Sequence, residues 1–144
     1  MSENNSTYIS YVQWTLDLED GIDPYDPLGT IKIVGDEGYI EDKCTYLDGY
    51  FEAIMLGVES LEKGKTIGID PFIEPDEIIF NYTNDYLLLG YGKQQAKIIN
   101  VKKFVTDVCQ SIQDLLDVLD NAPVRKNEPR PNFEIFRQFI QNYD

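Results

Sequence analysis

The clearest pattern along the chain is the spacing of apolar side chains in residues 45–63 and 100–120. In both stretches these side chains recur three and four positions apart, which puts them on one face of a helix. Thr45 followed by Asp48 resembles a helix-capping box, and Asn100 is a favourable residue at a helix N-terminus. The pattern therefore predicts two amphipathic helices that pack through their apolar faces.

Short segments rich in β-branched and aromatic residues flank these helices and predict strands. The predicted strands are residues 8–16, 30–34, 65–69, 77–82 and 86–91, with 96–99 as a further candidate. In the first of them, Val12, Trp14 and Leu16 fall on the more apolar side and are expected to face the core. Residues 83–85 have the composition of a hairpin turn.

The last part of the chain predicts a connector and a short helix. Residues 121–131 mix prolines with basic side chains, and residues 132–143 place several aromatic side chains on one side of a helix. We expect that helix to dock, because few proteins leave such a patch exposed. Together the elements predict a single domain, residues 1–144, of the α+β class. Its core would be a mainly antiparallel sheet of about five strands packed with two long amphipathic helices and a short C-terminal helix.

The formal net charge of −14 belongs to the first two thirds of the chain. Residues 1–92 hold 19 acidic and 4 basic residues, whereas residues 93–144 hold 7 acidic and 8 basic residues. A field of this sign speeds encounter with cationic partners and repels nucleic acid and anionic membranes. Acidity also serves solubility alone, so the net charge by itself does not identify a partner.

Two acidic segments supply the candidate binding residues. Residues 17–27 contain five carboxylates, a glycine and two prolines, so a surface loop is expected there. Residues 36–42 form a second acidic patch, and tyrosines, which suit interfaces, lie in both segments. We expect the two segments to form one composite surface that binds a basic protein. The candidate partner-binding residues are Asp17, Glu19, Asp20, Asp23, Tyr25, Asp26, Asp36, Glu37, Tyr39, Glu41 and Asp42.

Several kinds of chemistry are missing from the sequence. The chain has no histidine, which removes the commonest general base and the commonest transition-metal ligand. Cys44 and Cys109 lack the spacing of a zinc site and are expected to be reduced, packed thiols. The first acidic segment departs from the EF-hand register at its fifth and twelfth positions. We therefore expect no metal, no cofactor and no enzymatic activity, with a carboxylate-dependent hydrolase using Glu74, Asp76 and Glu77 as an alternative.

The sequence also indicates a compartment. The N-terminal residues are polar and lack the basic and apolar regions of a secretory signal. No apolar run approaches the roughly 18 residues that a membrane span needs. We expect a cytoplasmic protein that acts without membrane or direct nucleic-acid contact, as a monomer or weak dimer.

In overall style the chain resembles the bacterial immunity proteins of contact-dependent growth inhibition and other polymorphic toxin systems. The likeness lies in Trp14 on the opening strand, the acidic loops, and the amphipathic helices 45–63 and 100–120. It implies a cognate toxin, often a nuclease, whose basic active site is blocked by the bound immunity protein. The main alternative binding function is a small acidic secretion chaperone or adaptor, which would be expected to dimerise through an apolar helix face.

Overall fold

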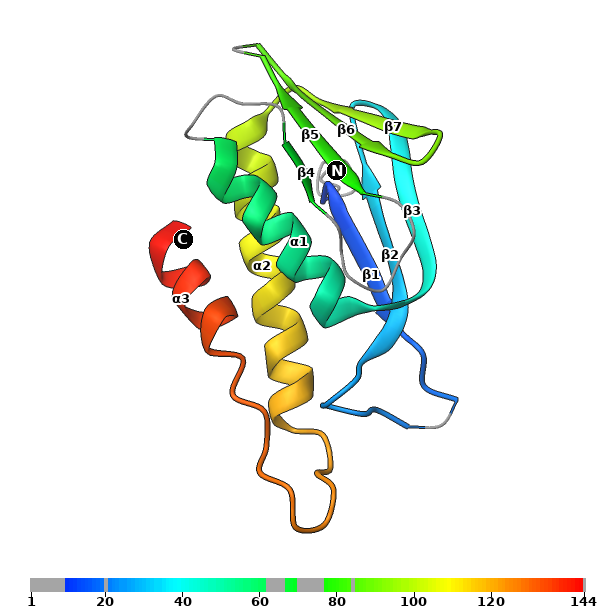
Figure 1. Ribbon diagram of the computed structural model, residues 1–144, viewed down its shortest axis with the longest axis vertical. Coiled ribbons are helices and arrows are strands. Elements are labelled where there is room, and N and C mark those ends of the chain that lie inside the picture. The colour runs from blue at the N-terminus through cyan, green and yellow to red at the C-terminus, as the bar shows by residue number, and fades with distance from the viewer. Residues whose placement is uncertain (1–9, 20, 62–66, 70–76, 84, 144) are drawn as a thin grey trace, which may run out of the picture.

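The computed structural model describes residues 10–19, 21–61, 67–69, 77–83 and 85–143. Within them, one antiparallel sheet of seven strands runs in the order β1-β2-β3-β7-β6-β5-β4 (Figure 1). The strands are β1 (Val12–Leu16), β2 (Leu28–Val34), β3 (Glu37–Tyr46), β4 (Ile67–Ile69), β5 (Ile78–Tyr82), β6 (Leu87–Tyr91) and β7 (Gln94–Ile98). Two runs of consecutive strands, β1 to β3 and β4 to β7, meet where β3 pairs with β7.

Three helices lie on one side of this sheet (Figure 1). Helix α1 (Leu47–Ser60) follows β3 directly and carries the chain to β4 at the far edge, so the next strands return towards β3. Helix α2 (Val101–Asp120) lies beside α1, and α3 (Glu134–Tyr143) is outermost, against α2. The side chain of Asn100 caps α2 by accepting a hydrogen bond from the Lys103 N–H at 3.0 Å, as the sequence predicts.

The core fills the space between the sheet and the helices. Along β2, β5 and β6 every second side chain is buried, which is the period expected when one face of a strand meets a core. Ile31, Ile33 and Phe80 from the sheet have no exposed surface and belong to the same apolar cluster as Phe51 of α1 and Phe104 of α2. Val12 is buried, and Trp14 and Leu16 are partly buried against that cluster, so the predicted inner face of β1 is correct.

The C-terminal helix α3 is held against α2 by buried aromatic side chains and by polar contacts near its N-terminal end. Phe136 and Phe139 of α3 are buried in the core cluster. At the start of the helix, Arg137 Nη2 lies 2.7 Å from Asp120 Oδ1, and Arg130 of the connector donates to the Leu119 carbonyl at 2.7 Å. These bonds satisfy acceptors at the C-terminal end of α2, where helix carbonyls lack intrahelical partners.

The predicted count of elements is wrong. The sheet has seven strands where about five were expected, and of the three helices only α2 is long, with 20 residues against 14 for α1 and 10 for α3. The strand that was missed altogether is β3, which includes the residues interpreted as an acidic patch, and β7 was expected only as a candidate at residues 96–99. Asp42 of β3 faces the core side, where an apolar residue is the usual signal. That carboxylate is accommodated because it accepts a hydrogen bond from the Tyr91 hydroxyl at 2.7 Å.

The start of α1 also differs from the expected capping box. The helix begins at Leu47, its N-cap residue is Tyr46, and no side-chain hydrogen bond caps it. Thr45 is instead the penultimate residue of β3, and its buried Oγ1 has no hydrogen-bond partner among the described residues. Asp48 therefore falls in the first helical turn, where a carboxylate interacts favourably with the helix dipole.

Candidate partner-binding site

Residues 17–27 form the surface loop between β1 and β2 that their glycine and prolines predict. The Asp17 N–H donates to the Leu28 carbonyl at 2.8 Å and closes the base of the loop. Two aspartate side chains then stabilise turns in the loop. Asp17 accepts a hydrogen bond from the Glu19 N–H at 3.0 Å, and Asp23 accepts one from the Tyr25 N–H at 2.9 Å. Such local bonds are typical of aspartate in turns. Asp20 lies outside the described residues.

Arg125 of the connector binds this loop, which the sequence reasoning missed. Its Nη2 lies 2.8 Å from Asp23 Oδ2 and 3.3 Å from Asp26 Oδ2, and its guanidinium stacks 4.4 Å from the centre of the Tyr25 ring. The Tyr25 hydroxyl accepts from the Arg125 N–H at 3.2 Å and donates to the Glu128 carbonyl at 3.3 Å. The Tyr25 N–H and then Arg125 hold the pKa of Asp23 below its ordinary value. Part of the loop's charge is thus already neutralised within the chain.

In the second acidic segment, two carboxylates are committed to the fold. Asp36 accepts from the Tyr11 hydroxyl at 2.8 Å and from the Ile99 N–H at 2.7 Å, which ties the turn before β3 to the start of α2. The Asp36 hydrogen bond also contributes, after burial, to raising the pKa of Tyr11. Asp42 is held by Tyr91, as described above.

The other predicted residues of this segment lie on β3 and interact with neighbouring strands. Glu37 lies 3.7 Å from Lys97 of β7. The backbone of Glu41 exchanges two hydrogen bonds with the side chain of Gln94, at 2.7 and 3.2 Å. Tyr39 is 49% exposed, with the Lys32 ammonium 4.3 Å from its ring centre. Cations therefore already lie against Glu37 and Tyr39 on this part of the sheet.

The structure does not bring the two acidic segments together. The 17–27 loop lies at the end of β2 where Leu28 pairs with Tyr46, whereas the 36–42 segment begins at the other end, where Val34 pairs with Tyr39. A strand of this length spans about 20 Å. The 17–27 loop and the start of the 36–42 segment are therefore not adjacent, and each segment is considered alone.

The first helical turns of α1 add carboxylates to the loop that sequence reasoning did not assign to it. The Leu47 N–H donates to the Pro27 carbonyl at 2.8 Å, which places the start of α1 against the loop. Burial raises the pKa of the Asp48 carboxyl, and the charges of Asp26 and Glu52 raise it further. We call the set Asp17, Glu19, Asp23, Asp26, Asp48 and Glu52 the acidic end. The contact between Leu47 and Pro27 joins residues twenty positions apart, so no local sequence signal indicates it.

A cavity of about 210 Å³ opens within the acidic end. Leu16, Ile22 and Leu28 supply apolar surface, and Asp17, Asp23 and Asp26 supply carboxylates. An aliphatic stem with a cationic head matches this lining, since lysine and arginine side chains combine the two. Arg125 of the same chain already binds Asp23 and Asp26, so Asp17 is the lining carboxylate left for a basic side chain from another molecule.

Over the part of the chain that the structure describes, no three metal-binding side chains gather into a cation site. No helix in the described ranges is both long and apolar enough to span a bilayer. Neither a scan of protein-family models nor searches of curated proteins and of solved structures finds a match to this chain.

Proposed function

We propose that this chain is an immunity-type inhibitor that binds a basic protein toxin through its acidic end. The observation that carries the proposal is the contact between the 17–27 loop and the start of α1, where the Leu47 N–H donates to the Pro27 carbonyl at 2.8 Å and the carboxylates of Asp26, Asp48 and Glu52 lie near one another. Carboxylates that repel one another in the free chain gain free energy when a cation binds between them. Arg125 pairs with Asp23 and Asp26, which leaves the rest of the acidic end for a partner.

The cavity at the acidic end favours a protein partner over a free ion. Asp23 and Asp26 of its lining bind Arg125, and Asp17 remains beside three apolar side chains, a combination that suits the stem and the head of a lysine or arginine. The negative field would also speed the encounter with a basic surface. An enzyme that cuts nucleic acid needs such a surface, so a nuclease is the toxin class that we propose. In this proposal the chain acts in the cytoplasm and does not itself touch nucleic acid.

The structure does not favour the alternatives raised by the sequence. A secretion chaperone would offer an apolar helix face, but most apolar residues of α1 and α2 belong to the core, and α3 packs against α2. For the hydrolase, Glu74 and Asp76 lie outside the described residues, and Glu77 is exposed. The described residues therefore do not place Glu74, Asp76 and Glu77 together in a site.

The test uses the protein encoded by the neighbouring reading frame as the toxin. Coexpression of this chain should abolish its toxicity, and the purified chain should inhibit its nuclease activity at equal molar amounts. A variant carrying Glu19→Lys, Asp26→Lys and Glu52→Lys should lose most of this inhibition. The control variant, Glu59→Lys, Asp85→Lys and Glu134→Lys, changes the net charge equally at positions outside the acidic end and should inhibit fully.

Two results would contradict the proposal. One is a toxin whose activity is unchanged by a stoichiometric amount of this chain. The other is full inhibition by the acidic-end variant, which would move the interface elsewhere. Both variants should keep the wild-type circular dichroism spectrum, because the substituted side chains lie at the surface or only partly buried.

A further inference from the structure

Strand β1 forms one edge of the sheet and keeps unused hydrogen-bonding groups. The Val34 N–H donates to the Tyr11 carbonyl, and the Asp17 N–H donates to the Leu28 carbonyl, both at 2.8 Å. Because antiparallel strands bond through alternate residues, Val12, Trp14 and Leu16 direct their backbone groups away from β2. The Val12 N–H is bound by Ser10 Oγ at 3.1 Å. For the backbone groups of Trp14 and Leu16 at this edge, the described residues offer no partner.

This edge lacks the features that usually prevent strand pairing. Val12–Leu16 contains no charged residue and no proline, and its register with β2 continues without a bulge. Natural sheets blunt their edges with such features or with very short edge strands. At the opposite edge of the sheet, the described part of β4 is Ile67–Ile69. The β1 edge is therefore open to pairing with an added strand.

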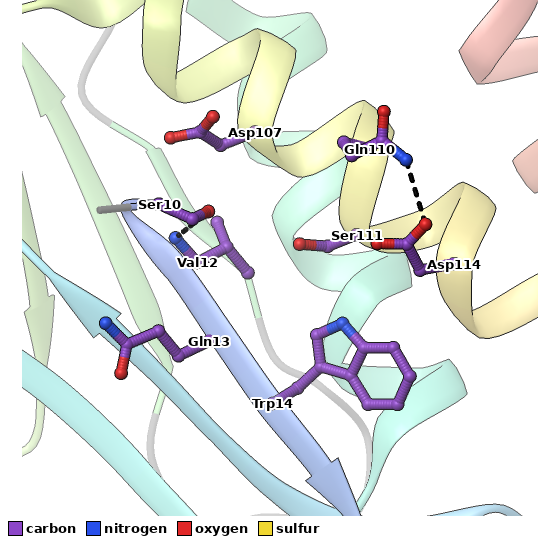
Figure 2. A pocket seen from close by; sticks show the side chains of 8 residues that line it. All are labelled: Ser10, Val12, Gln13, Trp14, Asp107, Gln110, Ser111 and Asp114. Carbon is purple, nitrogen blue, oxygen red and sulfur yellow. Dashed lines mark hydrogen bonds between the residues drawn. The ribbon is translucent and has the colours of Figure 1, made fainter. Parts of the chain in front are cut away.

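A cavity of about 420 Å³ runs along the same edge, between β1 and α2 (Figure 2). Trp14 lines it from the strand, and Asp107 and Asp114 line it from the helix. Asp107 already binds the Lys103 ammonium at 2.8 Å and the Tyr11 N–H at 2.9 Å. Asp114 is exposed and is oriented by Gln110, whose amide donates to it at 2.8 Å (Figure 2). The residues lining the cavity include no cation, so its net charge is negative.

We propose that an extended segment of a basic partner protein adds to β1 as an eighth strand and fills this cavity. Backbone bonds to Trp14 and Leu16 would supply affinity, as in other cases of strand addition. A lysine or arginine of the segment would lie against the Trp14 indole, which is the best aromatic surface for a cation, and reach Asp114. A second copy of this chain is a poor occupant, because each copy carries a net charge of −14. The inference rests on the proposed function, in which the same toxin supplies the segment.

The probe is a short capped peptide that alternates lysine and valine. Trp14 is the chain's one tryptophan, so its fluorescence reports directly on the cavity. Adding the peptide should shift that fluorescence and should slow hydrogen exchange at the Trp14 and Leu16 amides. A matched peptide with alternate amides N-methylated keeps its charge but cannot complete the strand. It should bind more weakly by roughly tenfold or more, since about two hydrogen bonds are lost.

Two variants of the chain distinguish binding in the cavity from a general effect of the negative surface charge. Asp114→Asn should weaken peptide binding by about fivefold, because a charge-assisted contact is lost. Asp117→Asn is the matched control: it lies on the same exposed side of α2 and also accepts a hydrogen bond from a glutamine four residues before it, at 2.9 Å. It does not line the cavity, so its effect should stay below about twofold.

Several results would overturn the proposal. The proposal is wrong if the Trp14 fluorescence does not change when the peptide is added, or if the N-methylated peptide binds with the same affinity as the unmethylated one. It is also wrong if Asp114→Asn and Asp117→Asn weaken peptide binding equally. Slow exchange at Trp14 and Leu16 in the free chain would show that the edge is already covered. Dimers in sedimentation that the peptide dissociates would identify a second copy as the occupant. The peptide test involves no toxin, so its failure leaves the acidic end standing, and failure of the toxin test leaves the peptide result standing.

Discussion

Replacing Gly57 with alanine should destabilise the chain, although the same change stabilises most helices. Gly57 lies on the buried face of α1, and a Cβ placed there would meet the Phe80 ring of β5, 2.5 Å from Cδ1 and closer still to Cε1 and Cζ. Phe80 has no exposed surface and lies within the core cluster, so the ring cannot move away without disturbing its neighbours.

The size of the effect follows from two opposing terms. Overpacking a filled core costs up to about 3 kcal/mol, and the approach to three ring atoms places this site at the upper end. Against this, replacing glycine with alanine inside a helix stabilises the helix by about 1 kcal/mol. The net loss is therefore about 2 kcal/mol, which for a chain of this size lowers the melting temperature by about 4–8 °C.

The assay is urea unfolding of the Gly57→Ala variant in two backgrounds. In the wild-type background the midpoint should fall. With Phe80→Leu, which removes the ring atoms, the same substitution should cost little, and the difference between backgrounds measures the contact. Equal stabilisation by Gly57→Ala in both backgrounds would refute the close packing of α1 on β5.

Three other substitutions test single features of the fold. The Asp48 pKa is raised in the folded chain, so folding binds the proton more tightly and stability falls as pH rises through that pKa. Asp48→Asn should therefore be more stable than wild type at neutral pH, and the difference should vanish below the ordinary aspartate pKa of 3.8. Cys44 has φ of 58°, in the left-handed region, so Cys44→Gly should gain about 1 kcal/mol in chemical denaturation. Thr45→Val removes a buried hydroxyl without a partner and should raise stability by about 1 kcal/mol in the same measurement.

The elements with a single strong local signal were predictable from the sequence. Helix α2 begins one residue after Asn100, because the cap and the apolar spacing indicate the same boundary. Strand β3 was not predictable in this way, since Asp42 breaks its alternation and the compensating Tyr91 hydroxyl comes from another strand. Strand β3 was missed for that reason, and β7 was expected only as a further candidate. A tertiary hydrogen bond allowed a polar residue where the pattern required an apolar one.

The candidate site was predictable only in part, for the same kind of reason. The 17–27 loop follows from its glycine and prolines, but Arg125, which binds Asp23 across about a hundred residues of chain, carries no local signal. Similarly, nothing near Trp14 in the sequence indicates the cavity that β1 forms with α2. Both features depend on how distant elements pack.

The most direct test of the proposed function is the affinity of this chain for the neighbouring toxin, measured over a range of salt concentrations. We expect tight binding that weakens as salt rises. The variant Glu19→Lys, Asp26→Lys, Glu52→Lys should lose at least about tenfold in affinity, mainly through slower association, and most of the salt dependence. The control variant Glu59→Lys, Asp85→Lys, Glu134→Lys should bind like wild type. Equal losses in both variants, or wild-type affinity in the first, would contradict an interface at the acidic end.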